Sequence, residues 1–336
     1  MTKPVREIEA AGVSAQQFQR DVVEACEPLV LRGAVRDWPM VQAGQRSPGT
    51  FRDYVLGFDA GRQMEAFFGD RTIAGKYYYS ADLAGFNFER KQMRFADALN
   101  AIVAALDHPG AQTMYVGSFP LAENLPGLAA QNPMPLLAPG IEGRIWLGHA
   151  SNVSTHYDTA DNLACCVAGR RRFTLYSPLL IESLYVGPID HTMAGQPVSL
   201  AASSPPDDEK YPLFKAVRDQ ALVAELEPGD ALYLPKLWWH KVEATAPFNG
   251  LVNYWWDAFS AGPDAPYTTL LFAMIAISER PEKERQAWKA LFEHYVFREH
   301  GHPLAHLPPE RHGLLGPLKE NYGRIRARIM HLLRGG

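Results

Sequence analysis

From residue 144 onward the sequence is a series of short β-rich runs separated by turn signals. Runs of this length, rich in β-branched and aromatic residues, are typical of strands in an all-β arrangement. Long helices do not separate them, so a jelly roll or barrel is favoured over a parallel α/β sheet. The predicted strands cover residues 144–147, 151–157, 163–168, 170–176, 231–235, 239–244 and 250–256.

Helices are expected on both sides of this β-rich region. Apolar residues recur at helical spacing in the first half of the chain and again after Pro266. We therefore expect a mainly β, α+β fold with N-terminal helices and supporting strands at 1–140, a β core at 141–260 and a helical segment at 261–336. The predicted helices cover residues 13–25, capped by Ser14, and residues 48–56, 95–106, 267–278 and 282–298, followed by a last helix bearing Ile325, Ile329, Leu332 and Leu333.

Three shorter regions complete the first half and the core. Residues 28–33, 64–79 and 113–117 are predicted as strands, and residues 120–139 as a loop with one helical turn. Residues 187–212 form a long polar insertion, and a loop of that length inside a compact domain is usually functional or mobile.

Composition excludes several classes of protein. The net charge of −4 supplies no basic field for nucleic acid, so a protein or peptide substrate is preferred over RNA. Cys26, Cys165 and Cys166 are too few for a disulfide framework or a zinc cluster. No apolar run approaches the length of a membrane span, and the N-terminus has no apolar signal region, so we expect a cytoplasmic protein.

The candidate metal ligands are His156 and Asp158, together with His240. On a strand, residues two apart point to the same face, so His156 and Asp158 share one side. His240, 82 residues further on, would add a second imidazole from a neighbouring strand. Two histidines and one carboxylate are the ligand set of non-haem Fe(II) oxygenases. The alternatives are structural histidines with local partners.

Strand parity also selects residues for a co-substrate. If Phe173 and Leu175 face the core, Arg171 faces inward with them. A buried arginine needs an anion, and 2-oxoglutarate supplies a carboxylate that arginine binds in bidentate fashion. The same parity places Ser154 inside. Asn162 and Asn253 are amides near or inside the barrel.

Several motifs together resemble the cupin-like Jumonji-C (JmjC) family of 2-oxoglutarate oxygenases and, within it, the asparaginyl hydroxylase that inhibits the hypoxia-inducible factor. They are His156-Tyr157-Asp158, Gly169-Arg170-Arg171-Arg172-Phe173, Pro228-Gly229-Asp230-Ala231-Leu232-Tyr233-Leu234-Pro235, Trp238-Trp239-His240 and Val252-Asn253-Tyr254-Trp255.

The resemblance implies a double-stranded β-helix with Fe(II) on His156, Asp158 and His240. It implies that 2-oxoglutarate binds at Arg171, where the family usually has lysine, with Tyr115 sharing its carboxylate and Asn162 and Asn253 nearby. Ser154 is the hydroxyl residue chosen on parity, with Thr155 second. The implied activity is a dioxygenase, in particular a hydroxylase of protein side chains. The implied assembly is a homodimer formed by the C-terminal helices.

Three alternatives stay open at this point. The first is a metal-dependent cupin enzyme that needs no 2-oxoglutarate, and the second is a tRNA or small-molecule hydroxylase of the same family. The third is a non-enzymatic sensor with the same barrel fold. The inward cation argues against the first, and the intact triad argues against the last.

Overall fold

The structure is a computed structural model that describes residues 2–78, 80, 85–108, 112–189, 192, 195–204, 209–260, 262 and 264–335. It contains two compact units, Met1–Ala258 and Phe259–Gly336. The expectations for residues 79, 190, 191, 193, 194 and 205–208 fall outside the described residues.

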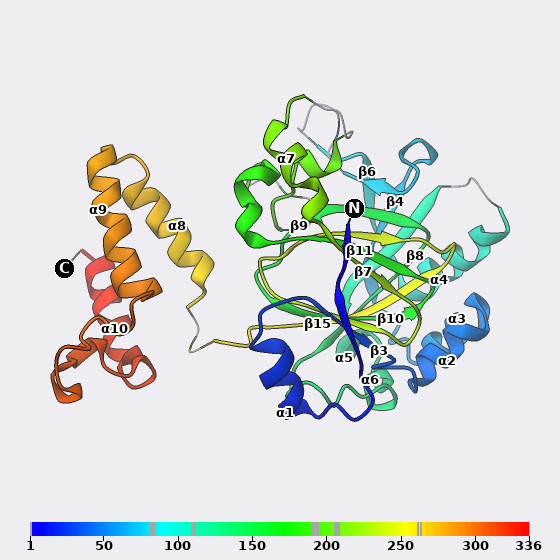
Figure 1. Cartoon of the computed structure of the whole chain (residues 1–336). Coiled ribbons are helices and arrows are strands. Elements are labelled where there is room, and N and C mark those ends of the chain that lie inside the picture. The colour runs from blue at the N-terminus through cyan, green and yellow to red at the C-terminus, as the bar shows by residue number, and fades with distance from the viewer. Residues whose placement is uncertain are drawn as a thin grey trace. The chain divides into compact units, whose positions relative to one another are not determined.

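The first unit is built on two facing β-sheets (Figure 1). In spatial order the six-stranded sheet is β1 (Lys3–Pro4), β12 (Leu222–Leu226), β11 (Arg171–Tyr176), β14 (Trp239–Ala244), β9 (Ser151–His156) and β5 (Lys76–Tyr77). The nine-stranded sheet is β2 (Arg6–Glu9), β3 (Leu29–Arg32), β13 (Ala231–Leu234), β10 (Asp161–Ala168), β15 (Asn249–Trp256), β8 (Gly143–Gly148), β7 (Thr113–Pro120), β4 (Gln63–Gly69) and β6 (Phe88–Arg94).

Apolar side chains form three layers around these sheets. One cluster, which includes Phe173 and Leu232, draws residues from both sheets and fills the space between them. A second packs the helices against the outer face of the nine-stranded sheet. A third, with Trp239 and Phe214, covers the outer face of the six-stranded sheet. The fold is therefore the expected α+β jelly roll. The inward-facing side chains of both sheets fill the space between them.

The two adjacent cysteines confirm this alternation. Cys165 belongs to the helix-covered cluster and Cys166 to the inner cluster, and both are fully buried. They act as small core residues on opposite faces of β10, as the sequence predicted.

The helices of the first unit begin and end close to the predicted positions. Ser14 caps α1 through a capping box, and the helix continues as a π-helical turn over Gln19–Val23. The predicted helix at 48–56 is α3, whose Phe51 and Val55 are fully buried. The helices are α1 (Ala15–Phe18), α2 (Pro39–Arg46), α3 (Pro48–Leu56), α4 (Phe95–Ala104), α5 (Leu121–Asn124), α6 (Leu128–Gln131) and α7 (Pro212–Val217).

The sequence prediction missed β1, β2, α2, β6, α7 and β12, and it expected one helical turn where α5 and α6 both form. Pro39 starts α2, a position that suits proline because the first helical turn does not need its backbone N–H. The strand β6 has mostly exposed charged residues, so it lacks the apolar alternation of a half-buried strand. The strands of the core are also not free of intervening helices, because the 3-10 helix Pro178–Leu184 and α7 lie between β11 and β12.

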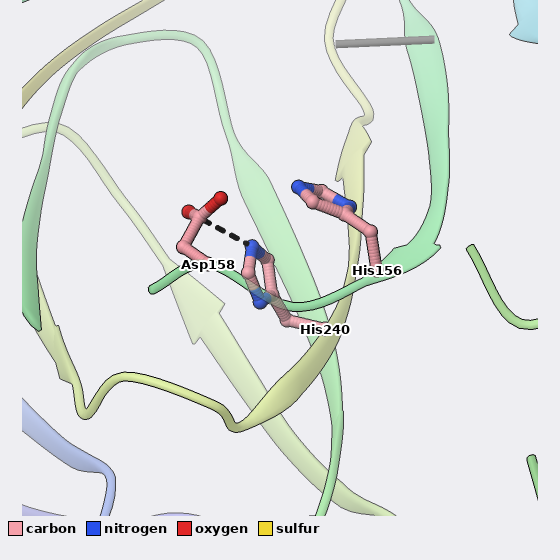
Figure 2. Close-up of side chains that lie close together, drawn as sticks. All are labelled: His156, Asp158 and His240. Atoms are coloured by element: carbon pink, nitrogen blue, oxygen red, sulfur yellow. Dashed lines mark ion pairs between the residues drawn. The ribbon is translucent and has the colours of Figure 1, made fainter. Parts of the chain in front are cut away.

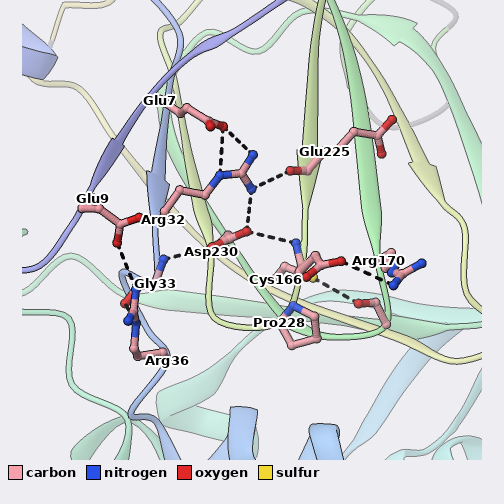
Figure 3. A network of polar contacts seen from close by, with 12 residues as sticks. Glu7, Glu9, Arg32, Gly33, Arg36, Cys166, Arg170, Glu225, Pro228 and Asp230 are labelled. Atoms are coloured by element: carbon pink, nitrogen blue, oxygen red, sulfur yellow. Dashed lines mark hydrogen bonds and ion pairs between the residues drawn. The ribbon is translucent and has the colours of Figure 1, made fainter.

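A polar network holds the turn that precedes β13, as Figure 3 shows. Gly229 has φ +109°, a conformation that glycine adopts without strain. The Asp230 carboxylate accepts a hydrogen bond from the Gly33 backbone N–H at 2.9 Å, and it forms an ion pair with Arg32 at 2.7 Å. Arg32 also pairs with Glu7. These contacts lock β13 beside β3 and so fix one wall of the inner space.

The second unit is helical, with α8 (Pro266–Ile277), α9 (Glu282–Phe292) and α10 (Leu318–Leu333). Asp264 forms an ion pair with Arg326 at 3.1 Å and accepts a hydrogen bond from Tyr322, which ties the start of α8 to α10. No residue of α8 is buried, although the helix is almost entirely apolar. Within the described residues, every helix is too short or too polar to cross a lipid bilayer.

Candidate metal centre

Two neighbouring strands and the loop after one of them bring the predicted metal ligands together. His156 at the end of β9 lies directly opposite His240 on β14 in the antiparallel register. Asp158 follows β9 by two residues, and its Oδ2 lies 3.7 Å from His240 Nε2. One candidate ligand atom from each of the three residues lies within 4.8 Å of the others. Figure 2 shows the three side chains converging on one point.

Backbone carbonyls set the orientation of both imidazoles. His156 Nδ1 lies 2.8 Å from the carbonyl oxygen of Ser154, and His240 Nδ1 lies 2.9 Å from that of Trp238. A carbonyl oxygen only accepts, so each Nδ1 carries the proton and each Nε2 keeps its lone pair. This outer hydrogen bond is the usual support of a metal-binding histidine. Both rings are therefore prepared to donate Nε2 to a cation.

Burial keeps His240 uncharged. Loss of solvent, together with a smaller effect of the neighbouring His156, lowers the pKa of His240 to about 4, while Asp158 opposes the shift. At neutral pH its Nε2 is consequently free to bind a metal without releasing a proton.

A bulge in β9 corrects the prediction for Ser154. His156 pairs with His240 and Val153 pairs with Val242, so three steps on β9 face two on β14. The alternation shifts there, and Val153 lines the inner cavity in place of Ser154. The Ser154 hydroxyl instead contacts the Tyr77 carbonyl oxygen at 3.5 Å. The prediction of an inward Ser154 is wrong because simple parity cannot account for a bulge.

The triad opens into a cavity of about 120 Å³ between the two sheets. Most of its wall is apolar, with Leu147, Val153 and Phe173 among the contributors. Among the predicted site residues, Tyr115, Asn162, Arg171 and Asn253 also line it.

Arg171 faces inward, as parity predicted, and is only 7% exposed. Within the described part of the chain its Nε has no hydrogen-bond partner. Burial lowers the pKa of Arg171 to about 10. Its neighbours on the strand, Arg170 and Arg172, are exposed and pair with Glu227 and Glu225. The cavity is therefore lined by a buried cation that forms no ion pair with a carboxylate of the described chain.

The strand register gives the backbone separation between Arg171 and the triad residue His240. On β14, Leu175 of β11 pairs with His240, while Arg171 pairs with Ala244. Four residues along a strand span about 13 Å.

Other lining residues were not selected from the sequence. Trp146 and Trp255 both reach the cavity, and the Trp255 indole N–H is buried with no partner among the described residues. Trp255 had a signal in the sequence, because it lies two residues from Asn253, but a tryptophan in a core strand is usually apolar packing. No inward position was predicted near Trp146.

The long insertion contributes to the site through its backbone. Val198 forms a β-bridge with His156, and the Ser199 N–H donates to the Thr155 carbonyl oxygen at 2.8 Å. Both Val198 and Ser199 are fully buried or nearly so. This part of the expected loop thus behaves as an extra edge for β9 and supports the strand that bears a metal ligand.

The histidines after α9 do not form a second centre in the described chain. His302 donates from Nε2 to the Leu315 carbonyl oxygen at 2.7 Å and accepts from the Leu304 N–H, so both ring nitrogens are occupied. Among the described residues, the triad is the group whose ligand atoms meet.

Comparisons with known proteins agree with this geometry. A family model described as a cupin-like domain matches residues 15–262, well over half of the chain. Jumonji C domain-containing protein 5 of Drosophila melanogaster is 28% identical over 254 residues, covering 73% of this chain and 58% of that protein.

Two further relatives carry names of enzymes. The bifunctional peptidase and (3S)-lysyl hydroxylase JMJD7 of Homo sapiens is 25% identical over 275 residues, covering 71% of this chain and 80% of that protein. tRNA wybutosine-synthesizing protein 5 of Gallus gallus is 40% identical over 108 residues, covering 32% of this chain and 30% of that protein. The chain therefore spans a little over half of the Drosophila relative and under a third of the chicken one.

Proposed function

The chain belongs to the cupin-like domain family, and from its triad and buried arginine we propose that it is an Fe(II)- and 2-oxoglutarate-dependent oxygenase that hydroxylates protein side chains. The observation that carries the proposal is Arg171, a buried cation without a carboxylate partner in the described chain, at the far end of the cavity from the triad. A metal alone would not require it.

The triad fits Fe(II). One ligand atom from each of two imidazoles and one carboxylate lies within 4.8 Å of the others, and this is the donor set of non-haem Fe(II) oxygenases. Iron held there by His156, Asp158 and His240 would supply dioxygen activation coupled to the oxidative decarboxylation of 2-oxoglutarate to succinate and CO₂. The Ser154 and Trp238 carbonyls keep the two rings in the tautomer that binds a metal.

Arg171 fits the co-substrate. The guanidinium presents several donors, which suits the distal carboxylate of a dicarboxylic acid. About 13 Å of strand, less the length of the arginine side chain, leaves room for a chain the length of 2-oxoglutarate between Arg171 and the triad. Tyr115 is proposed to share the distal carboxylate, and Asn162 and Asn253 to contact the end near the metal. The apolar walls exclude water and strengthen these polar contacts.

Protein side chains are the proposed substrate class. A relative named as a lysyl hydroxylase aligns with most of its own length, and the motifs resemble an asparaginyl hydroxylase, so lysine and asparagine are the two candidate side chains. The tRNA wybutosine-synthesizing relatives favour a tRNA substrate as the second candidate, because their identity over a shorter segment is higher. Mass spectrometry of cells with and without this protein separates the two substrate classes, because one added oxygen atom increases the mass of the modified protein or tRNA by about 16 Da.

The direct test uses the purified chain. We expect succinate and CO₂ to form from 2-oxoglutarate only when Fe(II) and dioxygen are both supplied, slowly without substrate and faster with a suitable lysate. Anaerobic titration of 2-oxoglutarate into the Mn(II)-loaded protein should show metal-dependent binding. Metal binding without any 2-oxoglutarate binding would favour a cupin enzyme of another class.

We also propose a homodimer formed through the second unit. The apolar helix α8 has no buried residue, and large side chains such as Leu270, Phe272 and Ile275 are exposed on it. Exposed apolar surface of this extent marks an association site in soluble proteins. A second copy provides the same surface, which suits a twofold interface.

Ile275→Glu is expected to convert the dimer to a monomer, because it places a charge on a side chain that is 81% exposed in the isolated chain. Sedimentation velocity at micromolar concentration measures the change. Leu179→Glu is the matched control, since Leu179 is 91% exposed but lies in the first unit. A wild-type chain that sediments as a monomer would contradict the proposal.

A further inference from the structure

Three side chains form a row of hydrogen bonds along one wall of the cavity. The Trp146 indole N–H on β8 donates to Asn253 Oδ1 on β15 at 2.9 Å. Asn253 Nδ2 in turn donates to Asn162 Oδ1 on β10 at 3.3 Å. The central strand β15 pairs with both β8 and β10, so the row crosses three adjacent strands. All three residues line the cavity.

The row has a direction, and Trp146 sets it. An indole N–H can only donate, so it requires the oxygen end of the Asn253 amide. The nitrogen end of Asn253 then faces Asn162 and requires the oxygen of that amide. Asn162 is left with its Nδ2 donors, which have no hydrogen-bond partner in the described chain. Without the indole N–H, both amides could turn over and the end of the row would become an acceptor.

We propose that Trp146 is a positioning residue that acts through the two asparagines to keep an amide N–H donor at the metal end of the cavity. The inference rests on the proposed function, because the ligand that it serves is an acceptor-rich 2-oxo acid. Asn162 is the second residue of β10 and follows two of the proposed metal ligands, Asp158 by four residues and His156 by six. An amide oxygen presented there would repel a carboxylate, whereas the N–H attracts it.

The orientation also explains a tryptophan in this wall. A phenylalanine would fill much of the same apolar space beside Tyr115 and Trp255, whose rings lie 6.4 and 6.3 Å from that of Trp146. Only the indole adds an obligatory donor. The side chain therefore combines wall packing with control of amide direction.

Trp146→Phe tests the inference. We expect its affinity for 2-oxoglutarate, titrated anaerobically into the Mn(II)-loaded chain, to fall about three- to tenfold, the usual effect of one hydrogen bond. Its Mn(II) affinity should remain within twofold of wild type. Trp38→Phe is the matched control, because Trp38 is also buried and donates from its indole, to the Pro133 carbonyl oxygen, but does not line the cavity. If Trp146→Phe melts at a much lower temperature, Trp146→Leu replaces it.

A double-mutant cycle distinguishes positioning from packing. In an Asn162→Ala background, Trp146→Phe should lower the affinity for 2-oxoglutarate by less than twofold, because the amide donor that Trp146 orients is already gone. Losses that multiply in the double variant would overturn the inference, as would equal affinity of Trp146→Phe and wild type. A wild-type chain that fails to bind 2-oxoglutarate would instead overturn the proposed function, so the two failures are distinguishable.

Discussion

Replacing His156 with alanine is expected to abolish Fe(II)-dependent turnover of 2-oxoglutarate. The substitution removes one of two imidazole ligands and leaves His240 and Asp158, which cannot define one face of the cation. Loss of a residue that merely orients a metal ligand costs about 10- to 100-fold in metal affinity or activity. Loss of the ligand itself should therefore exceed about 100-fold in succinate formation, measured by mass spectrometry.

The metal content of the same variant separates ligation from other damage. We expect less than a tenth of the wild-type iron after anaerobic loading and desalting, with an unchanged fold by circular dichroism. His300→Ala is the control, because His300 is exposed in the second unit and should leave both iron content and turnover as in wild type. Full iron content in His156→Ala would contradict the proposal that the triad binds the metal.

Strand parity explains why much of the candidate site could be predicted from the sequence. Inward and outward positions alternate along β10 as far as Cys166 and along β11, so Cys165, Cys166 and Arg171 were placed on the correct faces. The pairing of His156 with His240 follows from the antiparallel register of β9 and β14. Such local periodicity needs no knowledge of distant contacts.

The features that were missed depend on contacts between distant segments. The bulge at residues 154–155 lies where β9 pairs with β14 and where His156 also forms a bridge with Val198, and neither partner is visible in a local pattern. The row from Trp146 to Asn162 joins three strands whose order only the assembled sheet defines. The role of a side chain that acts through a neighbour is therefore less predictable than that of a direct ligand.

Arg171→Met is expected to move stability and binding in opposite directions. Burial lowers the pKa of Arg171 to about 10, so the folded state disfavours the charged form. That cost is fully present at neutral pH, and it is relieved only as the pH rises through about 10 towards the unfolded value. A neutral side chain of similar length removes it, and we expect the free energy of unfolding of the ligand-free protein to rise by about 1–3 kcal/mol. Urea denaturation at pH 7.5 measures the change.

The same substitution should lower the affinity for 2-oxoglutarate by more than about 100-fold, because a buried carboxylate of the ligand would lose its charge partner. Arg171→Lys keeps the charge and loses the fork, so we expect an intermediate loss of about tenfold or less. Arg172→Met is the matched control on the other face of β11, where an exposed pair with Glu225 contributes less than about 1 kcal/mol. A buried cation retained for structure alone would make Arg171→Met less stable and leave 2-oxoglutarate binding unchanged. A cation retained for a ligand stabilises the protein only when that ligand is bound, so the increase in melting temperature on adding 2-oxoglutarate should disappear in Arg171→Met and persist in Arg172→Met.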